Sequence, residues 1–133
     1  MSRVFLDTVG LLARWDRDDQ WHDTAKQAWL ALVAERAEVV TTSAVLLECG
    51  NAAARRVYRT HVDDLRQVLE RKEAVIHPTN EDWAQAWTAY RQGEADQAGI
   101  VDHVSFAVMR RLGLRQAFTN DRHFRAAGFE LCF

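Results

Sequence analysis

The chain has 133 residues, of which 48% are hydrophobic and 27% are charged, and its formal net charge at pH 7 is −2. This length predicts a single domain over residues 1–133 that can bury a continuous core without disulfides or structural metals. The charge excludes a globally basic nucleic-acid-binding protein, so any basic patch must be local. No apolar run is long enough for a membrane span, and the one at the N-terminus is too short for a signal peptide. We therefore expect a cytoplasmic protein without a membrane anchor.

Short runs of β-branched and aromatic residues alternate with longer stretches of helical periodicity. The runs predict strands at residues 3–6, 38–41, 74–77, 115–118 and 128–131. The stretches between them predict helices at residues 21–36, 43–58, 61–72, 80–92 and 100–112. This alternation predicts a three-layer α/β/α sandwich with a central, mainly parallel sheet. In such folds ligands bind beyond the carboxyl ends of the strands.

Two acidic residues follow predicted strands. Asp7 comes after the first strand and Asp121 after the fourth, so both should lie at the carboxyl edge of the sheet. Each has an ordinary alternative role as the N-cap of the helix that follows, and Asn120 offers the same capping chemistry as Asp121.

Two further acidic residues lie on predicted helices. Glu48 follows Val45 and Leu47 in a segment that is otherwise apolar. It either marks the edge of a solvated helix face or is a buried carboxylate that needs a charged or metal partner. Asp102 lies in the first turn of the apolar helix 100–112, where the helix dipole favours a negative charge in any case.

The four carboxylates are more informative together than singly. Convergent carboxylates repel one another, and a protein retains such a cluster when it binds a hard divalent cation. Ligands that are all oxygen suit Mg²⁺ or Mn²⁺. Such ions activate water and stabilise charge on a phosphodiester.

The ordered set of motifs resembles the PIN-domain family, and within it the VapC-like toxins of bacterial toxin–antitoxin pairs. The opening segment 4–8, Val-Phe-Leu-Asp-Thr, is similar to the first motif of the family, a strand that ends in Asp-Thr. The segments 41–48 and 101–109 are similar to its helical Glu motif and its third acidic motif. The segment 119–129, which begins Thr-Asn-Asp, is similar to its closing Thr-x-Asp motif.

This resemblance implies a magnesium- or manganese-dependent endoribonuclease with RNA as substrate, an antitoxin as partner and a homodimeric assembly. It places a set of carboxylates at the metal site: Asp7, Glu48, Asp102 and Asp121. Asp7 and Asp102 would be direct ligands, with Glu48 and Asp121 acting directly or through water. Hydroxyl groups would support the carboxylates, namely those of Thr8, Thr119 and Ser105.

Other interpretations of the residues remain. The family usually has Asn or Ser where this chain has Val9, so a catalytically weakened RNA- or protein-binding module is the alternative function. A phospho-receiver fits poorly, because the third predicted strand ends at His77-Pro78 and no lysine lies near the C-terminus. His103 and His123 adjoin site aspartates but form no ligand pair of their own. The tryptophans suit a core or a partner surface better than base stacking.

Overall fold

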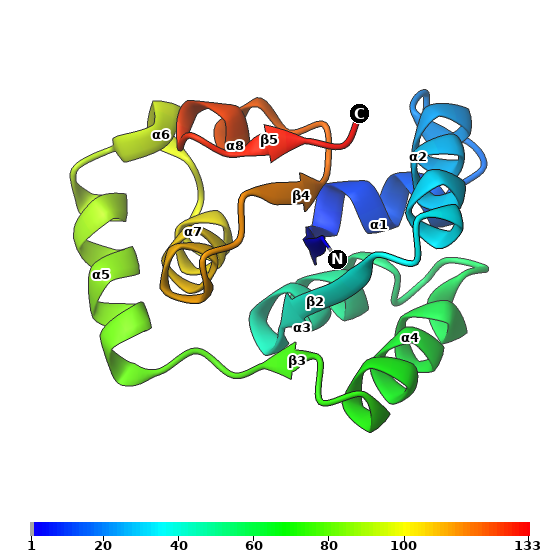
Figure 1. Cartoon of the computed structure of the whole chain (residues 1–133), viewed down its shortest axis with the longest axis horizontal. Helices are drawn as coiled ribbons and strands as arrows, with labels where there is room; N and C mark the ends of the chain where they lie inside the picture. Colours follow the sequence, from blue (N-terminus) through cyan, green and yellow to red (C-terminus); the bar gives the residue numbers. More distant parts are fainter. Residues whose placement is uncertain (1) are drawn as a thin grey trace.

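The computed structural model describes residues 2–133, and its centre is a five-stranded, all-parallel sheet (Figure 1). The strand order is β3-β2-β1-β4-β5. The strands are β1 (Arg3–Leu6), β2 (Glu38–Thr42), β3 (Val75–Ile76), β4 (Gln116–Phe118) and β5 (Glu130–Leu131). All five predicted strands are present, and the parallel pairing confirms the predicted α/β/α class.

Eight helices connect and cover the strands in the described part of the chain. They are α1 (Thr8–Trp15), α2 (His22–Ala34), α3 (Ser43–Ala52), α4 (Arg59–Arg71), α5 (Asn80–Arg91), α6 (Glu94–Gln97), α7 (Ile100–Leu112) and α8 (Arg122–Ala126). Figure 1 shows α1 and α2 at one end of the molecule and α5 and α6 at the other, with the sheet between them. No described helix is long and apolar enough to cross a membrane.

The structure differs from the helix predictions in one helix that ends early and in one short helix that was not predicted. The predicted helix 43–58 ends at Ala52, and residues 53–58 form turns before α4. Gly50 and Asn51 are weak helix formers, which accounts for the early end. The segment before α7 contains the short helix α6, in which Ala95, Asp96 and Gln97 all have positive φ angles, a conformation that no sequence pattern indicated.

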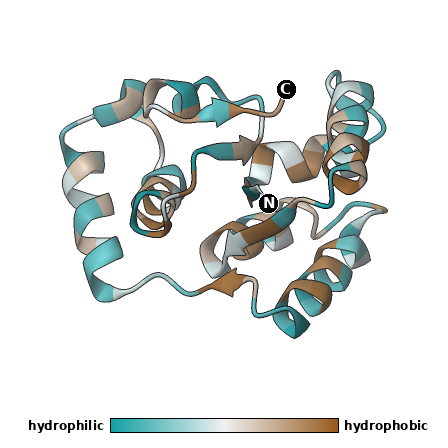
Figure 2. Cartoon of the chain, in the orientation of Figure 1, coloured by the Kyte–Doolittle hydropathy of each residue, from teal (hydrophilic) through white to brown (hydrophobic). Residues whose placement is uncertain are grey.

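The core forms where β1 and α7 meet. Val4, Phe5 and Leu6 of β1 are fully buried, and α7 contributes Val104 and Phe106. Figure 2 shows hydrophobic residues gathered on the strands and inner helix faces, with hydrophilic residues on the outer turns. The central strand β1 is therefore buried on both faces, as its short apolar sequence predicted, whereas the edge strands β3 and β5 are only partly buried.

Gly10 fixes how closely α1 approaches the sheet. A Cβ atom at this position would lie 2.0 Å from the backbone oxygen of Phe118 at the end of β4. Only glycine permits this contact. The contact holds the start of α1, and with it Asp7, against the carboxyl end of β4.

Candidate active site

Adjacent strands bring Asp7 and Asp121 to one edge of the sheet. Leu6 of β1 pairs with Phe118 of β4, and the next residues on both strands, Asp7 and Thr119, enter the site together. The hydroxyl of Thr119 donates to Oδ2 of Asp7 at 2.8 Å. Asp7 is 1% exposed and Thr119 is fully buried, so this hydrogen bond is shielded from water.

Asp7 does more than cap a helix. Its Oδ2 atom accepts the backbone N–H of Val9 at 3.3 Å, so the predicted N-cap role is real. Its Oδ1 atom is buried and has no hydrogen-bond partner among the described residues. Burial raises the pKa of Asp7 well above its usual range, the charges of Asp102 and then Asp121 add to the rise, and the Thr119 hydrogen bond opposes it. An orphaned buried oxygen among like charges is costly unless a cation completes the site.

Asp102 lies in the first turn of α7 and faces the same site. Burial raises its pKa to about 7, with further contributions from Asp121 and Glu48, while His123 lowers it. Ligand atoms of Asp102, Asp121 and His123 all lie within 4.8 Å of one another. The structure thus brings Asp102 and Asp121 together and adds a histidine.

Asp121 caps the short helix α8 through its Oδ1 atom. This atom accepts the backbone N–H of His123 at 2.9 Å and lies 2.8 Å from the ring Nδ1 of the same residue. The backbone N–H of Asp121 donates to the Thr119 hydroxyl at 3.0 Å. Thr119 therefore connects the two aspartates that follow β1 and β4.

Glu48 lies at the rim rather than inside the site. Its side chain is on the exposed side of α3, so the idea of a buried Glu48 that needs a partner is wrong. Val45 is buried beside it, but Leu47 is 71% exposed, and the apolar neighbours therefore gave a misleading signal. The charge of Glu48 still reaches the site, because it contributes to the raised pKa of Asp102.

The predicted supporting hydroxyls differ in what they contact. Only Thr119 is hydrogen-bonded to a site carboxylate. The Ser105 hydroxyl donates to the carbonyl of Val101 one turn earlier in α7, at 3.0 Å. The Thr8 hydroxyl is buried and has no hydrogen-bond partner among the described residues.

The two histidines next to site aspartates lie in different surroundings. His103 is buried, with its ring edge-on to those of Tyr90 and Phe106. His123 is at the site, hydrogen-bonded to Asp121. The sequence offered a signal for His123, since it lies two residues after Asp121, but adjacency alone did not separate it from His103.

The donor set fits a divalent cation. It consists of carboxylate oxygens with one imidazole nearby, which suits Mn²⁺ and, through the oxygens, Mg²⁺. The unpaired Oδ1 of Asp7 is the strongest sign of such a ligand, because it is buried and aspartates surround it.

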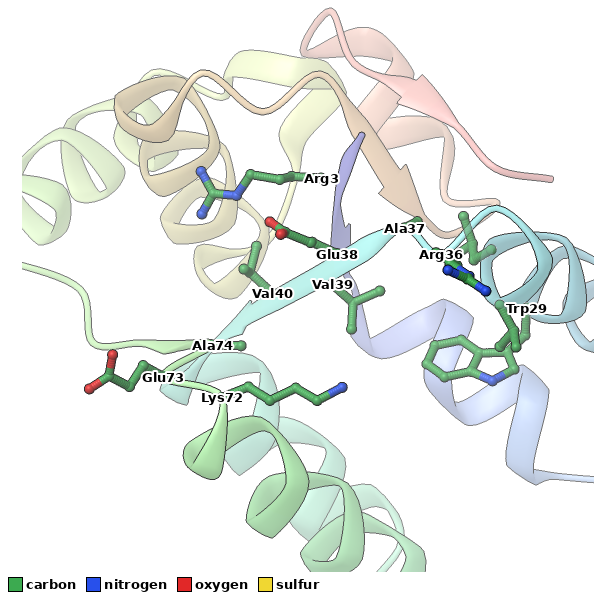
Figure 3. Close-up of a pocket in the computed structure, with 12 residues that line it drawn as sticks. Arg3, Trp29, Arg36, Ala37, Glu38, Val39, Val40, Lys72, Glu73 and Ala74 are labelled. Atoms are coloured by element: carbon green, nitrogen blue, oxygen red, sulfur yellow. The ribbon is translucent and has the colours of Figure 1, made fainter. Parts of the chain in front are cut away.

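A cavity of about 600 Å³ lies at the opposite edge of the sheet (Figure 3). It is lined by the first residues of two strands, Arg3 and Glu38, together with Trp29 of α2 and Lys72 after α4. Figure 3 shows its charged side chains spread around an apolar floor. No acidic cluster gathers there, so we assign the chemistry to the carboxyl edge despite the size of this cavity.

Comparisons with known proteins agree with this geometry. The PIN domain family model matches residues 4–130. The chain is 33% identical over 127 residues to the 23S rRNA-specific endonuclease VapC20 from two strains of Mycobacterium tuberculosis, with 95% of each chain covered. The crystal structure of M. tuberculosis VapC20, described as a Sarcin-Ricin loop cleaving toxin, superimposes with a TM-score of 0.78 at 30% identity, covering 95% of both chains.

A more distant structure supports the fold alone. FitAcB from Neisseria gonorrhoeae superimposes with a TM-score of 0.64 at 16% identity, covering 96% of this chain and 95% of the other. The family match extends over almost the whole chain and includes every element that carries a site carboxylate. The chain therefore belongs to the PIN-domain family.

Proposed function

We propose that this protein is a metal-dependent endoribonuclease and the toxin of a toxin–antitoxin pair. The observation that carries the proposal is the buried, unpaired Oδ1 of Asp7 beside Asp102 and Asp121. A carboxylate in this state is ready to bind a cation and poorly suited to a purely structural role. The 33% identity to a relative that is named as an endonuclease supports the same activity.

Asp7 and Asp102 are the direct ligands in this proposal, with Asp121 and Glu48 acting directly or through water. A bound Mg²⁺ or Mn²⁺ supplies a lowered pKa for its coordinated water and stabilises negative charge on the phosphodiester. Thr119 holds Asp7 in place, and the backbone N–H of Val9 fixes the same oxygen. Asp102 has a pKa of about 7 without a cation, so it can release its proton at neutral pH when a cation arrives.

The proposed substrate is RNA, with ribosomal RNA as the first candidate. The relative VapC20 is named as specific for 23S rRNA, and the similarity extends over 95% of both chains. Arg122 next to Asp121 is highly exposed, and its guanidinium lies 3.6 Å from the exposed carboxylate of Asp96. Such a loosely paired guanidinium beside an acidic site is suited to a backbone phosphate.

The proposed protein partners are an antitoxin and a second copy of the chain, in the cytoplasm. Two apolar surfaces are available for them. A cavity of about 350 Å³ is lined by Trp15, Trp29, Leu65 and Val68. Elsewhere, Trp87 of α5 is 53% exposed and, with its aromatic neighbours, forms a stripe along the helix. Exposed aromatic residues of this kind are frequent at protein interfaces.

The decisive experiment is RNA cleavage by the purified protein with Mg²⁺, with Mn²⁺ and with EDTA. We expect cleavage only with a divalent ion and none by Asp7→Asn. Undiminished cleavage in EDTA would contradict the metal mechanism. RNA binding without cleavage under every condition would favour the alternative, a catalytically weakened binding module.

A further inference from the structure

His123 is the one histidine in the described part of the chain whose ring contacts an acidic residue of the site. Its side chain is 26% exposed, and that of Asp121 is 16% exposed. The pair is therefore partly buried at the entrance of the site, where a ligand can still reach it.

His123 contacts the same oxygen of Asp121 through both its backbone and its ring. Oδ1 accepts the backbone N–H of His123 at 2.9 Å and faces its Nδ1 at 2.8 Å. An ionised carboxylate can only accept hydrogen bonds, so Nδ1 carries the proton and donates it. Oδ2 of Asp121 receives no hydrogen bond from the described residues and is the oxygen left open.

Asp7 is likewise held by the protein through only one of its two oxygens. Thr119 and Val9 occupy its Oδ2, and its Oδ1 is the orphaned atom. The Thr119 hydroxyl also accepts the backbone N–H of Asp121 at 3.0 Å. In each of the two aspartates one oxygen is hydrogen-bonded to the protein and the other accepts no hydrogen bond from the described residues, and Thr119 links the two.

We propose that His123 is a positioning residue, which holds Oδ1 of Asp121 through its Nδ1–H so that Oδ2 is presented to a divalent cation shared with Asp102. The inference rests on the proposed metal-dependent function. It assigns to His123 the part that Thr119 plays for Asp7. Losing a group that orients a metal ligand typically weakens metal binding by about 10–100-fold.

Substitutions can distinguish the roles of the two ring nitrogens of His123. In His123→Asn the side-chain amide nitrogen can take the place of Nδ1, whereas in His123→Gln it extends toward the place of Nε2. His123→Leu removes both nitrogens. The matched control is His77→Asn, because His77 is exposed after β3 and makes no hydrogen bond through its ring to the described residues.

The measurement is the dissociation constant of Mn²⁺ for each metal-free protein, by titration calorimetry. We expect His123→Leu and His123→Gln to weaken Mn²⁺ binding by about tenfold or more. His123→Asn should restore most of the affinity, and His77→Asn should match the wild type. In an RNA cleavage assay, excess Mn²⁺ should recover most of the rate of His123→Leu, because its defect is in metal affinity. Thermal unfolding in EDTA checks that each variant is folded.

Several outcomes would overturn the inference. Strong binding by His123→Gln with weak binding by His123→Asn would make Nε2 a direct metal ligand. Equal losses in all three His123 variants, or no loss in any, would show that the Nδ1 hydrogen bond does not matter. If the wild type neither bound Mn²⁺ nor cleaved RNA, the proposed function itself would fail, and the inference with it. Normal wild-type binding and cleavage beside unaffected variants would remove only the role of His123.

Discussion

Asp7 and Asp82 are both buried aspartates next to helix N-termini, but the protein treats them in opposite ways. Asp82 is 2% exposed, and both of its oxygens receive hydrogen bonds from the Arg111 guanidinium, at 3.1 and 2.8 Å. It also completes a capping box with Thr79 at the start of α5. The Arg111 hydrogen bonds lower the pKa of Asp82.

Asp7 is similarly buried, but no cationic side chain among residues 2–133 is paired with it. Its pKa is raised, chiefly by burial and by the charge of Asp102. The carboxylate of Asp82 is satisfied within the protein, whereas Oδ1 of Asp7 has no hydrogen-bond partner among the described residues. The two aspartates differ in how their oxygens are satisfied rather than in burial or capping, and this difference is the basis for proposing Asp7 as a ligand.

The largest expected effect is the loss of RNA cleavage in Asp7→Asn and, separately, in Asp102→Asn. Each substitution removes negative charge from the proposed metal site while keeping the shape of the side chain. We expect cleavage rates to fall by about a hundredfold or more, measured with saturating RNA and Mg²⁺. Asp82→Asn is the matched control, since it alters a buried aspartate outside the site and should cleave at a near-normal rate. Equal losses in all three variants would remove the distinction between the two aspartates.

The next effect is on stability with and without metal. The pKa of Asp102 in the folded protein is about 7, against an ordinary aspartate value of 3.8, so the folded state holds this proton more tightly than the unfolded state does. The stability that this proton contributes is fully present below about pH 4 and is lost as the pH rises through about 7. Asp102→Asn should therefore stabilise the metal-free protein at pH 8, by on the order of 1 kcal/mol.

Magnesium should reverse that ranking. A ligand at about 100 times its dissociation constant adds roughly 2.7 kcal/mol to the native state, and Asp102→Asn should gain little of it. Thermal unfolding of the wild type and Asp102→Asn at pH 5 and pH 8, with EDTA and with Mg²⁺, measures these differences in stability. If Asp102→Asn were less stable than the wild type in EDTA at pH 8, and Mg²⁺ stabilised both proteins equally, Asp102 would be a structural helix cap rather than a ligand.

The sequence was sufficient to predict the fold and the edge of the sheet at which Asp7 and Asp121 lie. It was not sufficient to predict the exposure of Glu48 or the hydrogen bonds among the site residues. Asp7 and Asp121 were predictable because each lies just beyond the end of a strand, and parallel strands bring their carboxyl ends to one edge. The exposure of Glu48 was not predictable, because apolar neighbours in the sequence do not fix which way a helix face points. The hydrogen bond between His123 and Asp121 depends on the geometry of a five-residue helix, which sequence spacing does not specify.

The Asp82–Arg111 pair was equally hidden, since 29 positions separate its members. Removing it should cost stability rather than activity. Asp82→Ala loses the capping box of α5, a change that typically costs about 1–2 kcal/mol. The ion pair adds less, because the Arg111 side chain is 41% exposed. Urea unfolding at pH 7 measures the loss, and Arg111→Met, which retains the capping box, should show only the smaller part. If Arg111→Met were the less stable of the two, the ion pair would outweigh the cap.

The smallest expected effect is that of Val9→Asn, which tests whether the family's usual polar residue is needed. Val9 is 39% exposed at the start of α1, and the group it offers to the site is its backbone N–H, which donates to Asp7 at 3.3 Å. An asparagine keeps that N–H and adds a polar side chain at the start of α1. Since the backbone contact survives, we expect cleavage at the wild-type rate or up to a few-fold faster, with a slightly lower Mg²⁺ requirement. Val9→Ala is the control, because it shortens the side chain without adding polarity. Cleavage rates over a range of Mg²⁺ concentrations compare the three proteins. A marked loss in Val9→Asn with normal cleavage by Val9→Ala would mean that a polar group at this position competes with the cation for Asp7, so that valine is the better residue in this site.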